Sequence, residues 1–207
     1  MAAPALGRAL SAAAAALLSS ADELNRLDGF AGDGDLGITM SEVARVLDEQ
    51  AAGAAHMEPA ELLRSCGAAV ARRAPSTSGT LTATAFLRAA KAVEGDGGSG
   101  LERVAACFTA AMEGVQARGK ASLGDRTVLD GLDAVCTSLK ASVKEGSSLA
   151  AALRAGAEAA SRFADASASM APKTGRASWM AERALGHPDA GCQALAIALQ
   201  AVAVSFE

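Results

Sequence analysis

The sequence predicts an all-α fold in a single domain that spans residues 1–207. Alanine, the strongest helix former, makes up roughly a quarter of the chain. Apolar residues recur at helical spacing almost everywhere, as at Leu101, Val104, Phe108 and Val115, and no comparable run alternates with a period of two. With 51% hydrophobic residues, the chain is able to bury a sizeable core, which excludes a disordered tail or a collagen-like rod.

Helices are expected wherever this spacing runs between breaks rich in Gly, Ser, Asp or Pro. The eight helices that we predict cover 4–24, 38–52, 58–73, 80–94, 100–117, 127–144, 148–169 and 190–205. The connections at 95–100 and 145–147 are short and are typical of plain turns. Four longer loops carry unusual chemistry, and we expect function to lie there: 28–37, 74–80, 118–126 and 171–191.

Charge and cysteine content narrow the function classes. The net charge is −4, and no basic cluster is longer than Arg72-Arg73, so the chain lacks the electrostatic footprint of a nucleic-acid binder. No two of the four cysteines form a CxxC pair, which favours buried free thiols in a reduced, cytoplasmic protein. These cysteines are Cys66, Cys107, Cys136 and Cys192.

The first helix is the one segment with an alternative interpretation. Residues 9–18 follow Arg8 and resemble the core of a signal peptide. The run is short and continues into Leu24 and Leu27 as an amphipathic helix does, which favours the helix. No segment reaches about 18 uninterrupted apolar residues, so no membrane span is expected.

The first of the four loops crowds three carboxylates and four glycines into the stretch Leu27 to Gly37. Carboxylates this close repel one another unless a cation neutralises them, and the glycines let Asp28, Asp33 and Asp35 converge. Oxygen ligands without a nearby His or Cys suit Mg²⁺ or Ca²⁺, although Ala44 stands where an EF-hand requires a glutamate. The alternative is a solvated Asp-Gly turn.

The next two loops lead directly into helices. Residues 74–79 offer hydroxyls and the first free amides of a helix, which suit phosphate oxygens, and the alternative is an ordinary Ser/Thr N-cap. The loop from Gly119 to Thr127 is longer than a helical hairpin requires, and either Asp125 or Thr127 is suited to cap the following helix.

The last loop gathers Trp179, His187, Arg176 and Arg183. Guanidinium groups suit phosphate recognition because they offer paired donors with a fixed positive charge. The alternatives are that Trp179 is a core anchor and that His187 is a hydrogen-bonded loop residue.

Taken together, the four loops resemble the L subunit, or L domain, of dihydroxyacetone kinases, in order and with similar spacing over nearly the whole chain. The family's LD-x4-D-x-D-(H/C)-G and GG-(A/T)-SG-x-L segments resemble Leu27 to Gly37 and Pro75 to Leu81. Its GK-x3-GDKTM-x-D and GRASYLGERSIGH-x-DPG segments, which are long and specific, resemble Gly119 to Asp130 and Gly175 to Gly191.

The resemblance implies a closed barrel of eight antiparallel helices that holds Mg²⁺ and an adenine nucleotide, ADP or ATP, in the loops at one end. It implies that two Mg²⁺ ions bridge the nucleotide phosphates and are held by Asp28, Asp33 and Asp35. The residues implied to approach the phosphates are Gly37, Ile38, Thr39, Thr77 and Ser78. Those implied to line the rest of the nucleotide site are Gly119, Val128, Arg176, Asp189, Ala190 and Gly191.

The implied reaction is phosphoryl transfer, in which metal ions and positive groups neutralise charge and the protein mainly positions the reactants. In the family a separate K subunit or domain binds the triose covalently through a histidine and presents its hydroxyl. This chain has only His56 and His187, so it resembles half of an enzyme. Two phosphoryl donors remain open: exchangeable ATP, or tightly held ADP recharged by a phosphohistidine protein of the phosphotransferase system.

Three positions depart from the family's pattern. Leu36 stands where His or Cys is usual, Pro75-Ser76 replaces Gly-Gly, and Val128 replaces the Met beside the adenine. These departures keep open another small ketose or polyol as acceptor, and a non-catalytic regulatory module. A further alternative is the nucleotide domain of the related fatty acid kinases, which works with a lipid-binding protein.

Overall fold

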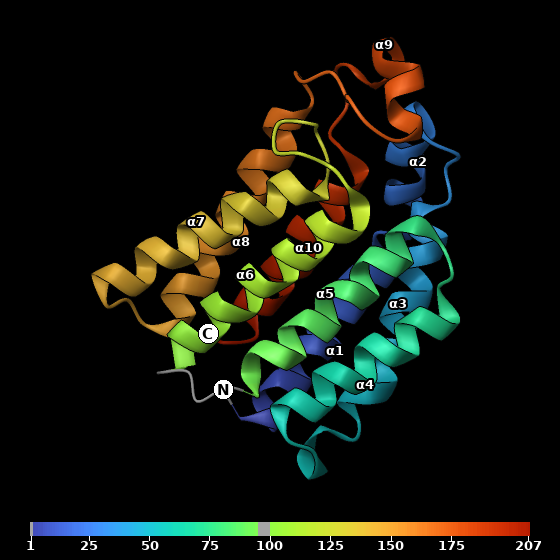
Figure 1. Cartoon of the computed structure of the whole chain (residues 1–207). Coiled ribbons are helices and arrows are strands. Elements are labelled where there is room, and N and C mark those ends of the chain that lie inside the picture. Colours follow the sequence, from blue (N-terminus) through green and yellow to red (C-terminus); the bar gives the residue numbers. More distant parts are fainter. Residues whose placement is uncertain (1, 95–99) are drawn as a thin grey trace.

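The computed structural model describes residues 2–94 and 100–207, except for the side chain of Arg176. In this part of the chain, eight long helices form a closed ring in which each contacts the next and the last packs on the first (Figure 1). In ring order they are α1 (Ala3–Ser19), α3 (Leu36–Ala51), α4 (Pro59–Arg73), α5 (Thr77–Val93), α6 (Gly100–Gly119), α7 (Val128–Glu145), α8 (Leu149–Ser167) and α10 (Ala190–Val204). The predicted all-α barrel of eight helices is confirmed.

Shorter elements extend this ring. They are α2 (Ala21–Ala31), α9 (Ala181–Ala184) and the 3₁₀ turns η1 (Ala54–His56) and η2 (Arg176–Met180). The predicted loop 171–191 is therefore partly helical, since it contains η2 and α9. The predicted turn at 95–99 lies outside the described residues.

The predicted helix 4–24 is wrong in its extent. The chain turns at Ser20, which has φ −104° and ψ 7°, and α2 then continues to Ala31. Leu24 and Leu27 are 0% and 4% exposed, and this anchorage in the core keeps the chain helical past Gly29. Asp28 consequently belongs to the last turn of a helix and not to a loop.

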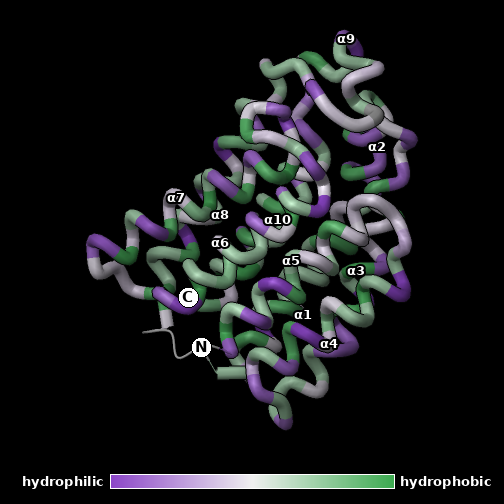
Figure 2. The backbone as a smooth tube through the Cα atoms, in the orientation of Figure 1, coloured by the Kyte–Doolittle hydropathy of each residue, from purple (hydrophilic) through white to green (hydrophobic). Residues whose placement is uncertain are grey.

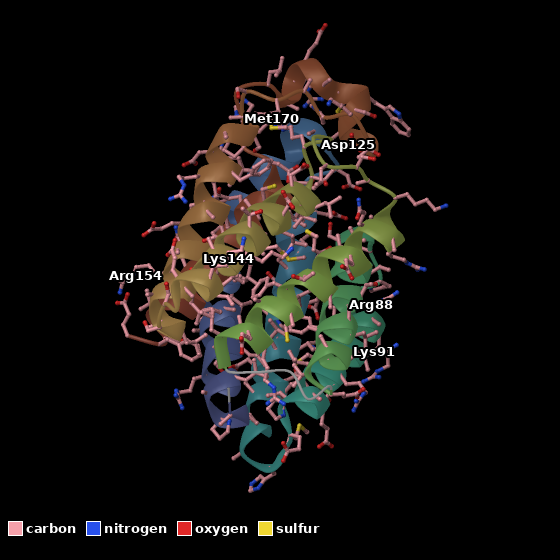
Figure 3. All side chains as sticks on the ribbon, turned by 60° about the vertical axis from the view of Figure 1, so that its left-hand side comes forward. Arg88, Lys91, Asp125, Lys144, Arg154 and Met170 are labelled. Atoms are coloured by element: carbon pink, nitrogen blue, oxygen red, sulfur yellow. The ribbon has the colours of Figure 1, made fainter. Side chains whose placement is uncertain are left out.

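The ring is built from amphipathic helices that pack closely through small residues. Hydrophobic and hydrophilic residues are interspersed along every helix (Figure 2). Charged side chains such as Arg88, Lys144 and Arg154 point away from the barrel (Figure 3). Alanines at helix contacts bring neighbouring helices close, among them Ala44, Ala152, Ala160 and Ala164, each 0% exposed. Each leucine buried between them contributes roughly 1.5–3 kcal/mol.

The cysteines lie in the ring as free thiols. Cys66, Cys136 and Cys192 are buried as predicted, and Cys107 is half-buried. Burial raises the pKa of Cys66 to about 12 and that of Cys107 to about 11. These groups therefore stay protonated near neutral pH. No helix among the described residues combines the length and apolarity that crossing a bilayer requires.

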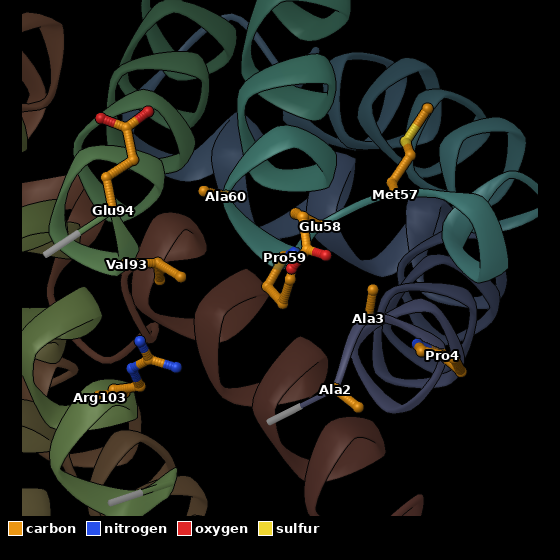
Figure 4. Close-up of a pocket in the computed structure, with 10 residues that line it drawn as sticks. All are labelled: Ala2, Ala3, Pro4, Met57, Glu58, Pro59, Ala60, Val93, Glu94 and Arg103. Carbon is orange, nitrogen blue, oxygen red and sulfur yellow. The ribbon is translucent and has the colours of Figure 1, made fainter. Parts of the chain in front are cut away.

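All eight helices of the ring line a central apolar cavity of about 370 Å³. At the end of the barrel near the termini, a second pocket of about 520 Å³ opens between α1, α4, α5 and α6 (Figure 4). Pro59, Val93 and Arg103 line both the pocket and the cavity. The pocket and the cavity therefore adjoin at the end of the barrel near the termini.

Candidate nucleotide and metal site

The alternation of helix direction brings the four chemically unusual loops together. Because ring neighbours run antiparallel, successive connections lie at opposite ends of the barrel (Figure 1). The connections at 20–35, 74–76, 120–127 and 168–189 all lie at the upper end in Figure 1, which we call the site end. The opposite end, near the two termini, is the far end. The loops thus converge although they are far apart in sequence.

Three carboxylates converge where α2 ends. Oxygen atoms of Asp28, Asp33 and Asp35 all lie within 4.8 Å of one another. Asp28 Oδ2 accepts hydrogen bonds from the amides of Gly34 (2.8 Å) and Asp35 (3.1 Å), which fold the turn back onto the helix. Gly34 has φ +77°, a left-handed conformation that favours glycine. The cluster offers hard oxygen donors of the kind that Mg²⁺ prefers, so the residues fit this ion.

The first turn of α3 follows directly and packs tightly on α2. A Cβ atom at Gly37 would lie 1.9 Å from the carbonyl oxygen of Ala21, so only glycine permits this approach. The Ile38 amide donates to Asn25 Oδ1 at 3.2 Å, while the Ile38 side chain is exposed. Asn25 was not singled out from the sequence, because a lone asparagine in a helix carries no signal of its distant partner.

The start of α5 lies beside the start of α3. Ser76 caps α5, since its Oγ accepts from the Gly79 amide at 3.0 Å. Thr39 Oγ1 donates to the same Ser76 Oγ at 3.2 Å, which joins the two helix starts through hydroxyl groups. The N-cap alternative is therefore confirmed for Ser76, and Thr77 and Ser78 form the first turn that follows. Two neighbouring helix N-termini favour an anion at this place.

Two of the departures from the family pattern, Leu36 and Pro75, are compatible with the backbone at the starts of α3 and α5. Leu36 is 6% exposed and points into the cavity, so its apolar side chain is accommodated by the core. Pro75 is exposed and precedes the cap, where it has no helical amide to supply.

The remaining predicted residues surround the mouth of the cavity. Ser78, Val128 and Gly191, from α5, α7 and α10, all line it, and a Cβ atom at Gly191 would lie 3.4 Å from Val128 Cβ. Gly119 ends α6 near Leu81, another lining residue, and a Cβ atom at Gly119 would lie 3.4 Å from Leu81 Cδ2. An edge that favours anions therefore adjoins an apolar mouth. A nucleotide is divided in the same way, into charged phosphates and a less polar base.

Asp189 and Ala190 begin α10 at this mouth. Asp189 is the N-cap, and its Oδ1 accepts from the Cys192 amide at 2.8 Å. Burial raises the pKa of Asp189, against the opposing effects of the hydrogen bonds from Cys192 and of the positive charge of Arg126. On the neighbouring loop, Thr127 rather than Asp125 caps α7, in a capping box with Asp130. The sequence did not predict that Asp189 is a cap.

Residues 168–189 form an arm that reaches from α8 across the site end to α2. The ring of His187 stacks on Phe30 with 3.4 Å between centroids, and Arg183 Nη2 donates to Gly29 O at 3.3 Å. Trp179 is 83% exposed on η2, so the core-anchor alternative is wrong: the short 3₁₀ turn stands outside the ring. Arg176 begins η2, and its side chain lies outside the described residues.

Comparison with known proteins places these features in one family. Residues 30–204 match the family model described as the DAK2 domain. The D-erythrulose kinase of Mycolicibacterium smegmatis is 38% identical over 201 residues, which cover 96% of this chain and 34% of that protein. The chain thus spans about a third of this relative's length.

Two further matches agree in both sequence and fold. The ADP-binding subunit DhaL of the PEP-dependent dihydroxyacetone kinase of Escherichia coli is 30% identical over 187 residues, covering 90% of this chain and 89% of that subunit. The crystal structure of the dihydroxyacetone kinase from C. freundii, in complex with AMP-PNP and Mg²⁺, superposes with a TM-score of 0.75 at 28% identity, over 96% of this chain and 33% of that one. The chain therefore belongs to the DAK2 domain family, as its resemblance to dihydroxyacetone kinase L subunits indicated.

Proposed function

We propose that residues 1–207 form an L-type kinase domain that binds an adenine nucleotide with two Mg²⁺ ions and transfers a phosphoryl group to a small ketose. The observation that carries this proposal is the convergence at one end of three carboxylates, two helix N-termini and an apolar mouth. Separate loops supply these parts, and together they match the charge, phosphate and base of a metal-bound nucleotide.

The proposed roles follow from position. Asp28, Asp33 and Asp35 hold the ions, which when bound neutralise charge on the phosphates during transfer. The first turns of α3 and α5, with Gly37, Ile38, Thr39, Thr77 and Ser78, orient the phosphates. Gly119, Val128, Asp189, Ala190 and Gly191 enclose the rest of the nucleotide, with Arg176 supplied by the arm.

The acceptor is proposed to come from a separate K-type subunit. Large apolar side chains are exposed at the site end, at the start of α3, in the loop 120–127 and on the arm: Ile38, Leu123, Trp179 and Leu185. Such residues around an open mouth support docking of another protein surface there. Relatives named as dihydroxyacetone and erythrulose kinases support a three- or four-carbon ketose as substrate. We place this complex in the cytoplasm.

Calorimetric titration with ADP and ATP, with and without Mg²⁺, tests the nucleotide site, after a check for nucleotide that co-purifies. We expect Mg²⁺-dependent binding that Asp33→Asn weakens about a hundredfold, because one of three carboxylates is lost. Asp22→Asn, which removes the same charge from the exposed start of α2, is the matched control. Equal nucleotide affinity in all three proteins would contradict the proposal and favour a regulatory module.

Reconstitution with a K-type subunit then tests transfer. Phosphorylated dihydroxyacetone or erythrulose is the expected product, and its absence with a binding-competent chain would exclude ketose kinase activity. ADP that survives purification and is recharged only by a phosphohistidine protein would identify that donor, whereas turnover with added ATP would identify ATP. Phosphorylation that requires a fatty-acid-binding partner would point to the lipid alternative.

A further inference from the structure

Arg126 is a buried cation that none of the predicted roles uses. It lies in the loop 120–127, one residue before the cap of α7, and is 3% exposed. Its φ is +62°, a left-handed conformation that a non-glycine residue rarely adopts. Burial lowers the pKa of Arg126, and the nearby charge of Asp189 opposes this effect. Arginine is seldom fully buried unless it is paired, so its partners define what it does.

The partners are main-chain carbonyl groups at both roots of the arm. Nη1 donates to Met170 O at 2.9 Å, and Nη2 donates to Ala184 O at 3.0 Å and to His187 O at 2.6 Å. Met170 precedes η2, whereas Ala184 and His187 follow it. One guanidinium group therefore joins the segment that enters the arm, at Met170, to the segment that leaves it, at Ala184 and His187.

Neighbouring contacts tie the same loop to the arm. The Lys173 amide donates to Asp125 O at 3.1 Å, and Asp125 and Met170 both lie at this end of the barrel (Figure 3). Cys192 Sγ, in the first turn of α10, donates to Thr127 O at 3.2 Å. The loop before α7 thus holds the arm and the start of α10 in one arrangement, with Arg126 at its centre.

We propose that Arg126 is a positioning residue that fixes the arm and Asp189 for nucleotide binding without contacting the nucleotide. This inference rests on the proposed function. The planar fork of arginine donates to several carbonyls in fixed directions, and the lysine that the family's GDKTM segment has at this position offers one ammonium group to the same carbonyls. The effect should fall on nucleotide affinity and on the order of the arm, and not on the K-type acceptor.

Arg126→Lys and Arg126→Met test this assignment beside the control Arg154→Lys, which alters an exposed arginine paired with Glu207 at the far end. We expect Arg126→Met to weaken Mg-ADP binding, and to raise the nucleotide KM, by about tenfold or more, with the ketose KM unchanged, and Arg126→Lys, which keeps the charge and a donor group, to have a smaller effect. Amide hydrogen exchange should accelerate within 170–187 and stay unchanged in α4 and α5.

Several outcomes separate the possibilities. Wild-type affinity and exchange in Arg126→Met would overturn the proposal, because the arm would then keep its position without the guanidinium group. A fall in melting temperature with unaltered KM would assign a merely structural role and also overturn it. If Arg126→Met fails to fold, Arg126→Gln, which replaces the charged fork by a single neutral amide group, decides. If the wild-type chain binds no nucleotide, the proposed function fails, while the exchange of 170–187 in Arg126→Met or Arg126→Gln still reports whether Arg126 holds the arm.

Discussion

At the site end of the barrel, polar side chains bond to the backbone of other segments, beside exposed ion pairs such as Arg26–Glu23, whereas the described far-end contacts compared with them are ion pairs between exposed side chains. Asp28, Asn25 and Arg126 each accept from or donate to main-chain groups outside their own turn. At the far end, Arg64 pairs with Glu94 and Arg154 with Glu207, all of them about half exposed. Backbone bonds fix a chain segment in space, while exposed ion pairs add little stability.

The connections differ in the same way. The far-end turn between α7 and α8 begins with Gly146 in the left-handed conformation, a common way to end a helix, and needs no distant partner. At the site end, the caps Ser76 and Asp189 also contact neighbouring elements, through Thr39 Oγ1 and Ser167 Oγ. A cap that bonds only to its own helix therefore suffices to reverse the chain. Caps that also contact a neighbouring element are found where the candidate site lies.

The largest effect is expected where α3 approaches α2. Gly37→Ala should lower the free energy of unfolding by ~3 kcal/mol or more, because its Cβ would meet Ala21 O at 1.9 Å. That corresponds to a melting temperature lower by about 6–12 °C. Gly29→Ala, on α2 with nothing within 4 Å of the added Cβ, should be neutral or stabilising by up to ~1 kcal/mol. Equal melting temperatures would show that the helices move apart freely.

Two serine caps sharpen the contrast between the ends. Ser76→Ala and Ser148→Ala each remove a capping hydroxyl, from α5 at the site end and from α8 at the far end. Both should cost about 1 kcal/mol of stability in chemical denaturation. Only Ser76→Ala should also weaken Mg-ADP binding, because its hydroxyl joins the starts of α3 and α5. Loss of affinity in both variants would make the effect one of general stability.

The contact between the arm and α2 should contribute less. A double-mutant cycle on Phe30→Ala and His187→Ala measures the stacked pair, and we expect a coupling free energy of about 0.5–1.5 kcal/mol in unfolding experiments. A coupling near zero would mean that the arm does not depend on α2 for its position.

The smallest effect is expected at the far end. Arg154→Met breaks the exposed pair with Glu207 and should change the free energy of unfolding by less than ~1 kcal/mol at low salt and by still less at high salt, because salt screens an exposed pair. A larger loss, measured at low and high ionic strength, would contradict the proposed division between the two ends.

The sequence predicted the helices because apolar spacing and alanine content report directly on helix faces, and it implied the closed ring only through its resemblance to dihydroxyacetone kinase L subunits. It predicted Asp28, Asp33 and Asp35 as a cluster because they are neighbours along the chain. It missed the continuation of α2 because Gly29 suggests a break, whereas burial of Leu24 and Leu27 outweighs that local preference. Asn25 and Arg126 were missed because their partners are distant in sequence and are backbone atoms, which leave no pattern in side-chain identity.

The closed ring also imposes a rule of parity. Eight antiparallel helices return the chain to its starting side, so every second connection falls at the same end (Figure 1). Loss or gain of one helix would reverse the direction of all that follow and send the later loops to the wrong side. Only changes by helix pairs preserve the site, whereas individual far-end turns are free to vary in length. Both termini lie near that far end (Figure 1), where polypeptide joined to either of them would leave the mouth clear.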